Sequence, residues 1–298
     1  MLSIRNLSKT YPGGVHALDG VDLDIPRGMF GLLGPNGAGK STLMRTLATL
    51  QEADEGTVTF DDVDVLKDKD AVRRILGYLP QEFGVYSRIS ALAMLDHLAV
   101  LKGVTQRRQR KELVGHLLKM TNLYDVRKRN LSTFSGGMKQ RFGIAQALIG
   151  DPQLIIVDEP TAGLDPEERN RFLNLLSEIG ENVVVILSTH IVEDVSDLCQ
   201  RMAILAGGKV RLVGEPATLK DGLRGKIWRK TIGKTELEDH QRRLTVISSR
   251  WLAGDLLIHV YSETPLGEGF EAVEPPRLED VYFSTLNRVA VDTPALAA

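Results

Sequence analysis

The stretch Gly34-Pro35-Asn36-Gly37-Ala38-Gly39-Lys40-Ser41-Thr42 decides the fold. It fits the pattern G-x-x-x-x-G-K-[ST], follows the apolar run 29–33 and precedes a segment of helical pattern at 43–48. Strand, loop and helix therefore come in the order of a phosphate-binding loop, and we predict a nucleoside triphosphate site. In such a site Lys40 reaches the β- and γ-phosphates and Ser41 ligates Mg²⁺. The alternative is a glycine-rich turn with an incidental Lys-Ser pair.

A second chemical element ends the apolar run 154–157. Asp158 and Glu159 follow this run directly, and an unbroken apolar run is typical of a central parallel strand. Ligands bind at the carboxyl ends of such strands. We expect Asp158 to lie beside the Mg²⁺ held by Ser41, and Glu159 to polarise the attacking water. The alternative is that two acids before Pro160 merely begin a turn.

The rest of the chain predicts an α/β protein built on a P-loop NTPase core. Its sheet is expected to be mixed and largely parallel, with an antiparallel β subdomain that begins with strands at 2–11 and 15–25. Helical patterns at 91–101 and 107–120 predict a helical subdomain inserted at about 85–150.

Further patterns define the C-terminal part of the chain. Beyond Gly214, three short strands and a helix at 278–286 predict a small α+β appendage. We therefore expect an ATPase domain at 1–215 and an accessory domain at 216–298.

Composition excludes several classes of protein. Lys and Arg total 37 against 39 Asp and Glu, and the net charge of −2 supplies no basic field for nucleic acid, which is not an expected partner. The only cysteine, Cys199, cannot form an intrachain disulfide, and we interpret it as a small core residue. No run approaches the ~20 apolar residues of a membrane span, and residues 1–5 enter a strand without a signal peptide. We expect a cytoplasmic protein.

Residues 1 to about 215 closely resemble the ATP-binding subunits of ABC transporters. The family's landmarks occur in order: Tyr11, the loop 34–42, Gln81, Ser135-Gly136-Gly137, Ala162-Gly163-Leu164-Asp165 and His190. The resemblance implies that Tyr11 stacks on adenine, and that Gln81 and His190 contact the γ-phosphate and the water, with Gln81 also near the metal. Taken singly, Tyr11 would more often be a core or hairpin aromatic, and the other two would be ordinary polar residues at strand ends.

The family's signature usually reads Leu-Ser-Gly-Gly-Gln, whereas this chain has Phe134-Ser135-Gly136-Gly137-Met138. The groups that should touch phosphate are kept, namely the Ser135 hydroxyl and the glycine N–H groups at a helix N-terminus. The resemblance implies that two ATPase domains face each other head to tail, with this loop over the partner's nucleotide and Asp165 at the dimer contact. The chain is therefore expected to act as a homodimer, or with a similar ATPase subunit.

Two further segments bear on the partner. Phe83, Val85 and Tyr86 follow Gln81 and resemble the surface where a membrane permease docks, although local packing is an equal alternative. The ending 278–283 resembles that of drug and natural-product export ATPases. The resemblance thus implies a peripheral subunit on the inner face of the cell membrane that powers a separate permease, for export. The alternatives are a non-transport ABC ATPase and a P-loop kinase.

Overall fold

The structure is a computed structural model that describes residues 1–81, 84, 88–161, 163–180, 182–267 and 269–288. It divides into two compact units. The first comprises Met1–His190 and Leu205–Val210, and the second comprises Ile191–Ile204 and Arg211–Ala298. The boundary expected at 215 stays a prediction, and these compact units divide the chain earlier, directly after His190.

The elements of the first unit are, in chain order, β1 (Leu2–Tyr11), β2 (Val15–Ile25), β3 (Gly28–Leu33), α1 (Lys40–Leu47), β4 (Glu55–Phe60), β5 (Val63–Asp64), α2 (Lys69–Ile75), β6 (Leu76–Leu79), α3 (Ala91–Leu101), α4 (Arg107–Met120), the 3-10 turn η1 (Leu131–Thr133), α5 (Gly136–Ala147), β7 (Leu154–Asp158), α6 (Pro166–Ile179) and β8 (Val184–Thr189). Residues of β9 (Arg201–Ala206) and β10 (Lys209–Gly214) fall in both units.

Four parallel strands of the first unit, in the order β3-β8-β7-β6, position the chemistry. Every residue of β7 and β8 is buried, as the unbroken apolar runs predict. The register pairs Leu33 with Thr189, Asp158 with Ser188, and Leu79 with Val157. The carboxyl ends of all four strands therefore lie at one edge of the sheet. The predicted site residues come at or after these strand ends.

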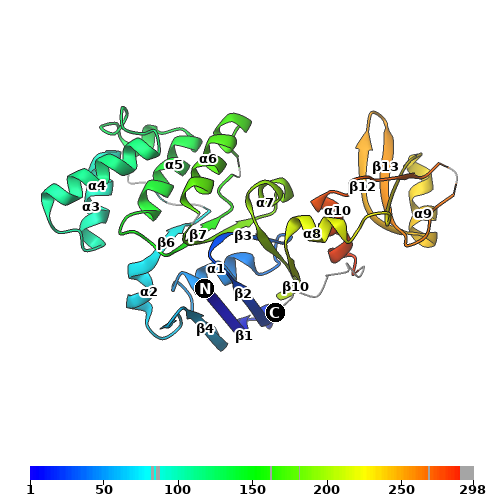
Figure 1. Cartoon of the computed structure of the whole chain (residues 1–298), viewed down its shortest axis with the longest axis horizontal. Helices are drawn as coiled ribbons and strands as arrows, with labels where there is room; N and C mark the ends of the chain where they lie inside the picture. The colour runs from blue at the N-terminus through cyan, green and yellow to red at the C-terminus, as the bar shows by residue number, and fades with distance from the viewer. Residues whose placement is uncertain (82–83, 85–87, 162, 181, 268, 289–298) are drawn as a thin grey trace. The chain divides into compact units, whose positions relative to one another are not determined.

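A second sheet of the first unit is antiparallel, in the order β2-β1-β4-β5. The antiparallel pairing of the first two strands was predicted from their alternation and is confirmed, with Tyr11 opposite Val15 at the hairpin end. In Figure 1 these strands lie apart from the helices α3, α4 and α5, which lie together. The antiparallel subdomain thus brings Tyr11 to the end of a hairpin.

The inserted helical subdomain is confirmed. Its helices bury Leu95, Leu118 and Phe142 in a core of their own. The apolar spacing on α4 predicts a face of Leu113, Leu117 and Met120, whereas the fully buried residues are Val114, Leu117 and Leu118. The sequence pattern at 65–74 also suits a helix, but α2 begins only at Lys69, because the Asp68 carboxylate accepts a hydrogen bond from the Ala71 N–H at 3.0 Å and caps the helix there.

The second unit contains α7 (Val192–Leu198), α8 (Pro216–Asp221), β11 (Ile227–Ile232), the 3-10 turn η2 (Lys234–Glu236), α9 (Leu237–Arg243), β12 (Thr245–Leu252), β13 (Asp255–Tyr261), β14 (Glu271–Ala272) and α10 (Leu278–Leu286). Its strands form an antiparallel sheet in the order β12-β13-β11-β14, and the expected α+β composition is confirmed. Within the described residues, no helix is long and apolar enough to cross a membrane.

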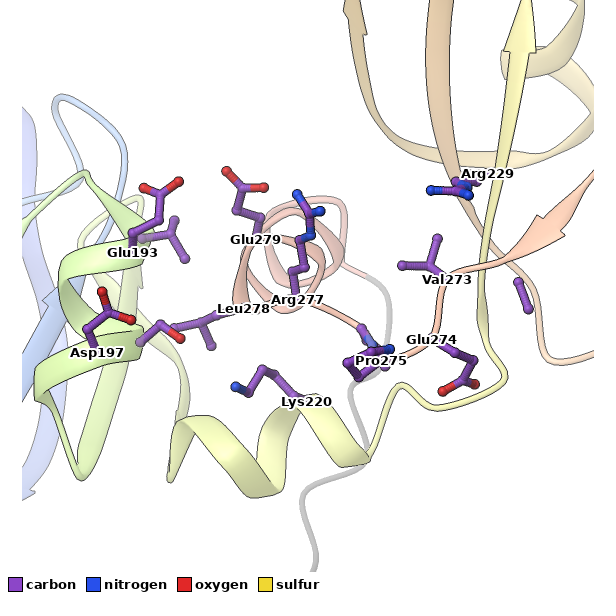
Figure 2. Close-up of a pocket in the computed structure, with 14 residues that line it drawn as sticks. Glu193, Asp197, Lys220, Arg229, Val273, Glu274, Pro275, Arg277, Leu278 and Glu279 are labelled. Carbon is purple, nitrogen blue, oxygen red and sulfur yellow. The ribbon is translucent and has the colours of Figure 1, made fainter.

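The second unit holds a cleft of about 540 Å³, which Figure 2 shows. Helix α10 begins at the cleft, and its N-terminus is held by Asp280, which is 2% exposed. One carboxylate oxygen of Asp280 accepts from the Arg277 N–H at 2.8 Å, and the other lies 2.7 Å from Nδ1 of His259 on β13. The helix that contains the 278–283 ending is thereby fixed to its own sheet.

Candidate nucleotide site

The phosphate loop connects β3 to α1 and needs glycine at two positions for steric reasons. Gly39 has a φ of 107°, and a Cβ there would collide with the backbone oxygen of Ala17. A Cβ on Gly34 would collide with the backbone oxygen of Leu205. The chain can therefore turn into α1 without a side chain in the way, as a loop that wraps its backbone around an anion requires.

Lys40 begins α1 and is buried, with 6% of its surface exposed. Its Nζ donates to the carbonyl oxygen of Gly34 at 2.8 Å and lies 3.5 Å from Oε1 of Glu159. Nζ also donates to the carbonyl oxygen of Pro35 at 3.4 Å, so two carbonyls and one carboxylate hold this side chain next to the loop. This is the position that the sequence pattern predicts for a phosphate-binding lysine.

Glu159 stands where β7 ends, in a backbone conformation with a φ of 49°. Left-handed geometry is uncommon for a residue with a side chain, and it marks sites where the surroundings over-determine the backbone. Its N–H donates to the Ser188 carbonyl at 2.8 Å, which fixes the turn against β8. Oε2 of Glu159 lies 2.5 Å from Nδ1 of His190. The carboxylate is thus held between Lys40 and His190.

Asp158 is the last residue of β7 and is only 4% exposed. Burial raises the pKa of its carboxyl above the ordinary value, and the neighbouring Glu159 raises it further, whereas the Ser188 hydroxyl, Lys40 and the Ser41 hydroxyl act in the opposite direction. Its Oδ1 atom has no hydrogen-bond partner among the described residues. An unsatisfied buried carboxylate next to Ser41 fits a site for a cation such as Mg²⁺.

One cavity of about 430 Å³ gathers most of the predicted nucleotide-site residues. Its lining consists of Tyr11, Val15, His16, Ala17, Pro35, Asn36, Gly37, Ala38, Gly39, Lys40, Ser41, Thr42, Gln81, Glu159 and His190. Gly34 and Asp158 are not in this lining. Among the described residues no group of three or more His, Cys, Asp or Glu side chains could hold a metal, so a cation would depend on Asp158, Ser41 and the phosphates themselves.

Sequence reasoning missed two supporting residues. The Tyr11 hydroxyl donates to Oε1 of Gln51, beyond α1, at 2.8 Å and lies 3.3 Å from the hydroxyl of Thr42 in the first turn of α1. These two contacts anchor the ring at the cavity. His16, across the hairpin turn from Tyr11, also lines the cavity. Gln51 follows the helix by a few residues and carries no motif, whereas His16 lies close enough in the sequence to Tyr11 to have been considered.

The signature residues are not part of this cavity. Ser135 is exposed and caps α5, because its Oγ accepts from the Met138 N–H at 3.2 Å. Gly136 is exposed beside it. Asp165 is also exposed and caps α6 through a 2.8 Å bond from the Glu168 N–H. Their expected contacts with a second copy stay a prediction.

The three predicted docking residues, Phe83, Val85 and Tyr86, lie outside the described residues, as does Ala162 of the segment before Asp165. A different surface of the first unit has the character expected of a docking site. A cleft of about 630 Å³ lies between residues that follow α1, residues of α2 and β6, and the end of α3, with exposed Leu50 and Leu101 in its lining.

Comparisons with known proteins agree with this geometry. A family profile described as "ABC transporter" matches residues 18–162. The chain is 34% identical over 278 residues to the daunorubicin/doxorubicin resistance ATP-binding protein DrrA of Streptomyces peucetius, covering 93% of this chain and 82% of DrrA. It is 31% identical over 314 residues to the probable multidrug ABC transporter ATP-binding protein YbhF of Escherichia coli, covering all of this chain and 54% of YbhF. The chain thus spans about half the length of that relative.

A solved structure extends the likeness to three dimensions. The dimeric post-hydrolysis structure of the ATP-binding cassette MJ0796, bound to ADP and Pi, has a TM-score of 0.66 and 28% identity with this chain. The match covers 72% of this chain and 98% of MJ0796. With the phosphate loop, the Lys40–Glu159–His190 cluster and these relatives together, the chain belongs to the ATP-binding proteins of ABC transporters.

Proposed function

We propose that this chain binds ATP with Mg²⁺, hydrolyses it in a pair of ATPase subunits, and powers a separate membrane permease for export. The observation that carries the proposal is the cluster of Lys40, Glu159 and His190 on the cavity that the phosphate loop lines. A loop for phosphates, a cation for the γ-phosphate and a carboxylate for water are the parts that phosphoryl transfer to water requires.

The geometry suggests how these side chains act in sequence. Without nucleotide, the Lys40 ammonium is shared between Gly34 and Glu159. Phosphate oxygens would replace those partners, which releases Oε1 of Glu159 to accept a proton from the attacking water. The contact between Oε2 and His190 fixes the orientation of the carboxylate while this happens. Gln81 lines the same cavity and is placed to orient the water.

The metal site rests on Asp158 and Ser41, with Gln81 as a third candidate. The orphaned Oδ1 of Asp158 is the observation that fits a cation there. Mg²⁺ supplies charge neutralisation on the β- and γ-phosphates when it is bound. Asp158 and the Ser41 hydroxyl would hold it, and ionised Asp158 would gain a partner that the described residues do not provide.

Pairing of two copies is supported by the exposure of the two segments that the family uses for it. Ser135, Gly136 and Asp165 are all exposed and lie at helix N-termini, so their loops are available to a second chain. A Cβ on Gly136, at the start of the twelve-residue helix α5, would meet nothing within 4 Å, so the space beside this helix N-terminus is open. We infer that this loop completes the ATP site of the partner copy.

Export is supported by the extent of the likeness to DrrA. That match covers 93% of this chain, so it reaches beyond the ATPase part into the C-terminal unit, and DrrA is named for resistance to two drugs. The predicted exporter-type ending at 278–283 forms the buried face of α10, with Leu278, Val281 and Tyr282 inside. The cargo itself belongs to the permease.

The cleft beside α3 is our proposed docking surface for that permease, which would hold the chain at the inner face of the cell membrane. Leu50 and Leu101 are 59% and 70% exposed, and exposed apolar residues that line a groove mark an interaction site. Exposed Arg74, which has no ion pair among the described residues, lies at the same cleft. An apolar helix with an acidic residue in a cytoplasmic loop of the permease fits this chemistry.

Hydrolysis without any acceptor separates this function from that of a P-loop kinase. We expect the purified chain to release phosphate from ATP with Mg²⁺ and no added acceptor. Lys40→Ala should weaken ATP binding, whereas Glu159→Gln should keep it and slow turnover by at least ~10²-fold, because only the base is lost. Phosphate release that requires a small-molecule acceptor, or a fully active Glu159→Gln, would contradict the assignment.

The docking surface has a separate test in cells. Leu101→Ser should reduce recovery of the chain with membranes of its own host and leave hydrolysis by the purified protein unchanged. Trp251→Ser is a matched control, because Trp251 is 61% exposed but lies on β12 of the other unit. Equal recovery of both variants would remove the cleft from the proposal.

A further inference from the structure

A buried ion pair lies between the signature helix and the helix that follows Asp165. Nη2 of Arg141, on α5, is 3.2 Å from Oε1 of Glu168, on α6. The two side chains are only 10% and 20% exposed. Nη1 of Arg141 also donates to the carbonyl oxygen of Asn122 at 3.3 Å, just beyond α4. Arg141 therefore links α4, α5 and α6, which are separated in the sequence.

The same carboxylate packs against the signature itself. Gly137 is buried, and a Cβ at that position would lie 2.8 Å from Cγ and 2.6 Å from Cδ of Glu168, closer than real side chains approach. Glu168 therefore occupies the space that a side chain at 137 would need. Its Oε2 atom is buried without a hydrogen-bond partner among the described residues. Packing against Glu168 therefore requires glycine at position 137, independently of any contact with phosphate.

Glu168 is also in the first turn of α6, which Asp165 caps. The Glu168 N–H donates to Asp165 while its side chain reaches α5, so one residue touches both of the segments that we place at the dimer contact. Breaking a buried pair by removing one partner leaves an uncompensated charge and is strongly unfavourable. The two segments are therefore held in one relative position.

We propose that the Arg141–Glu168 pair, packed against Gly137, is a positioning element that sets the loop Ser135–Gly137 relative to Asp165 and so enables two copies to close on ATP. The inference rests on the proposed function, because it concerns the pairing step. Neither side chain lines the nucleotide cavity of its own chain. The pair should accordingly affect pairing and leave the binding of ATP to a single copy unaffected.

The test uses the full chain with the substitution Glu159→Gln, which is expected to bind ATP without rapid hydrolysis. Further substitutions are added to this parent and compared. Glu168→Gln should raise the dissociation constant of the ATP-driven dimer at least about tenfold in analytical ultracentrifugation, because Arg141 loses its counter-charge. ATP affinity measured on dilute, monomeric protein should stay the same. Glu167→Gln is the matched control on the same turn: its partner Arg171, which also lies 3.8 Å from Oε1 of Glu168, is 52% exposed, and the dimer should be unaffected.

A double-mutant comparison keeps the proposal testable if one variant folds poorly. Gly137→Ala should weaken the dimer in the parent chain because its Cβ displaces the Glu168 carboxylate. In a chain with Glu168→Ala the same substitution should add little, because the space is vacant. Additive effects, or a Glu168→Gln dimer as tight as the parent, would overturn the positioning role. If the parent Glu159→Gln chain itself fails to dimerise with ATP, the proposed function fails instead.

Discussion

Replacing Asp158 by asparagine should stabilise the nucleotide-free protein while it damages the metal site. The carboxyl is 4% exposed, and burial holds its pKa above the ordinary 3.8, so the ionised form that prevails at neutral pH is disfavoured in the folded chain. We therefore expect Asp158→Asn to raise the Tm near pH 7.5, where for a chain of this size each kcal/mol gained is worth roughly 2 °C.

The pH dependence gives the sign of this effect. Because the folded pKa lies above the unfolded one, the carboxyl's favourable contribution is complete below pH 3.8 and is lost as the pH rises through the folded value. The Tm advantage of the variant should therefore be present at neutral pH and shrink as the pH falls toward 4. Calorimetry of both proteins across this range is the assay. A variant that melts below the parent at pH 7.5 would refute the view that this charge is held unfavourably.

The remaining predictions concern the loop, the rim and the thiol. Gly39→Ala should lower Tm and abolish ATP binding, because a φ of 107° costs a residue with a side chain about 1–3 kcal/mol and its Cβ meets the Ala17 carbonyl; unchanged melting and binding would refute this. Gln51→Leu should raise the Kd for ATP about 2- to 10-fold at unaltered Tm, because Tyr11 loses one hydrogen bond. An unchanged Kd in equilibrium binding would show that this hydrogen bond does not contribute to ATP binding. Cys199, whose pKa burial raises to about 12, should resist iodoacetamide at pH 8 until the chain unfolds, and rapid labelling of the native protein would contradict its burial.

The sequence predicted the parts of the site that local pattern determines. The loop 34–42 and the acids after β7 are contiguous motifs at strand ends, and a parallel register brings all such ends to one edge. Gln51 and the Arg141–Glu168 pair could not be predicted in this way. Their partners lie 40 and 27 residues away in the sequence, and only the packing of helices decides that they meet.

The start of α2 shows the same limit on a smaller scale. The apolar spacing from Val65 onward suits a helix, yet Asp64 accepts hydrogen bonds from the N–H groups of Leu66 and Lys67 and holds these residues in a turn. Local side-chain bonds of this kind compete with the helix, and periodicity alone does not report them. The helix therefore begins only after the cap at Asp68.

Mixing two inactive variants tests the shared ATP site most directly. Lys40→Ala damages the phosphate loop and keeps the signature, whereas Ser135→Arg places a bulky cation in the signature and keeps the loop. If each site combines the loop of one copy with the signature of the other, one intact site forms in every mixed pair. The account predicts that an equimolar mixture hydrolyses ATP well above the sum of the two variants measured separately. A mixture no more active than that sum would contradict the claim that two copies of this chain complete each other's site.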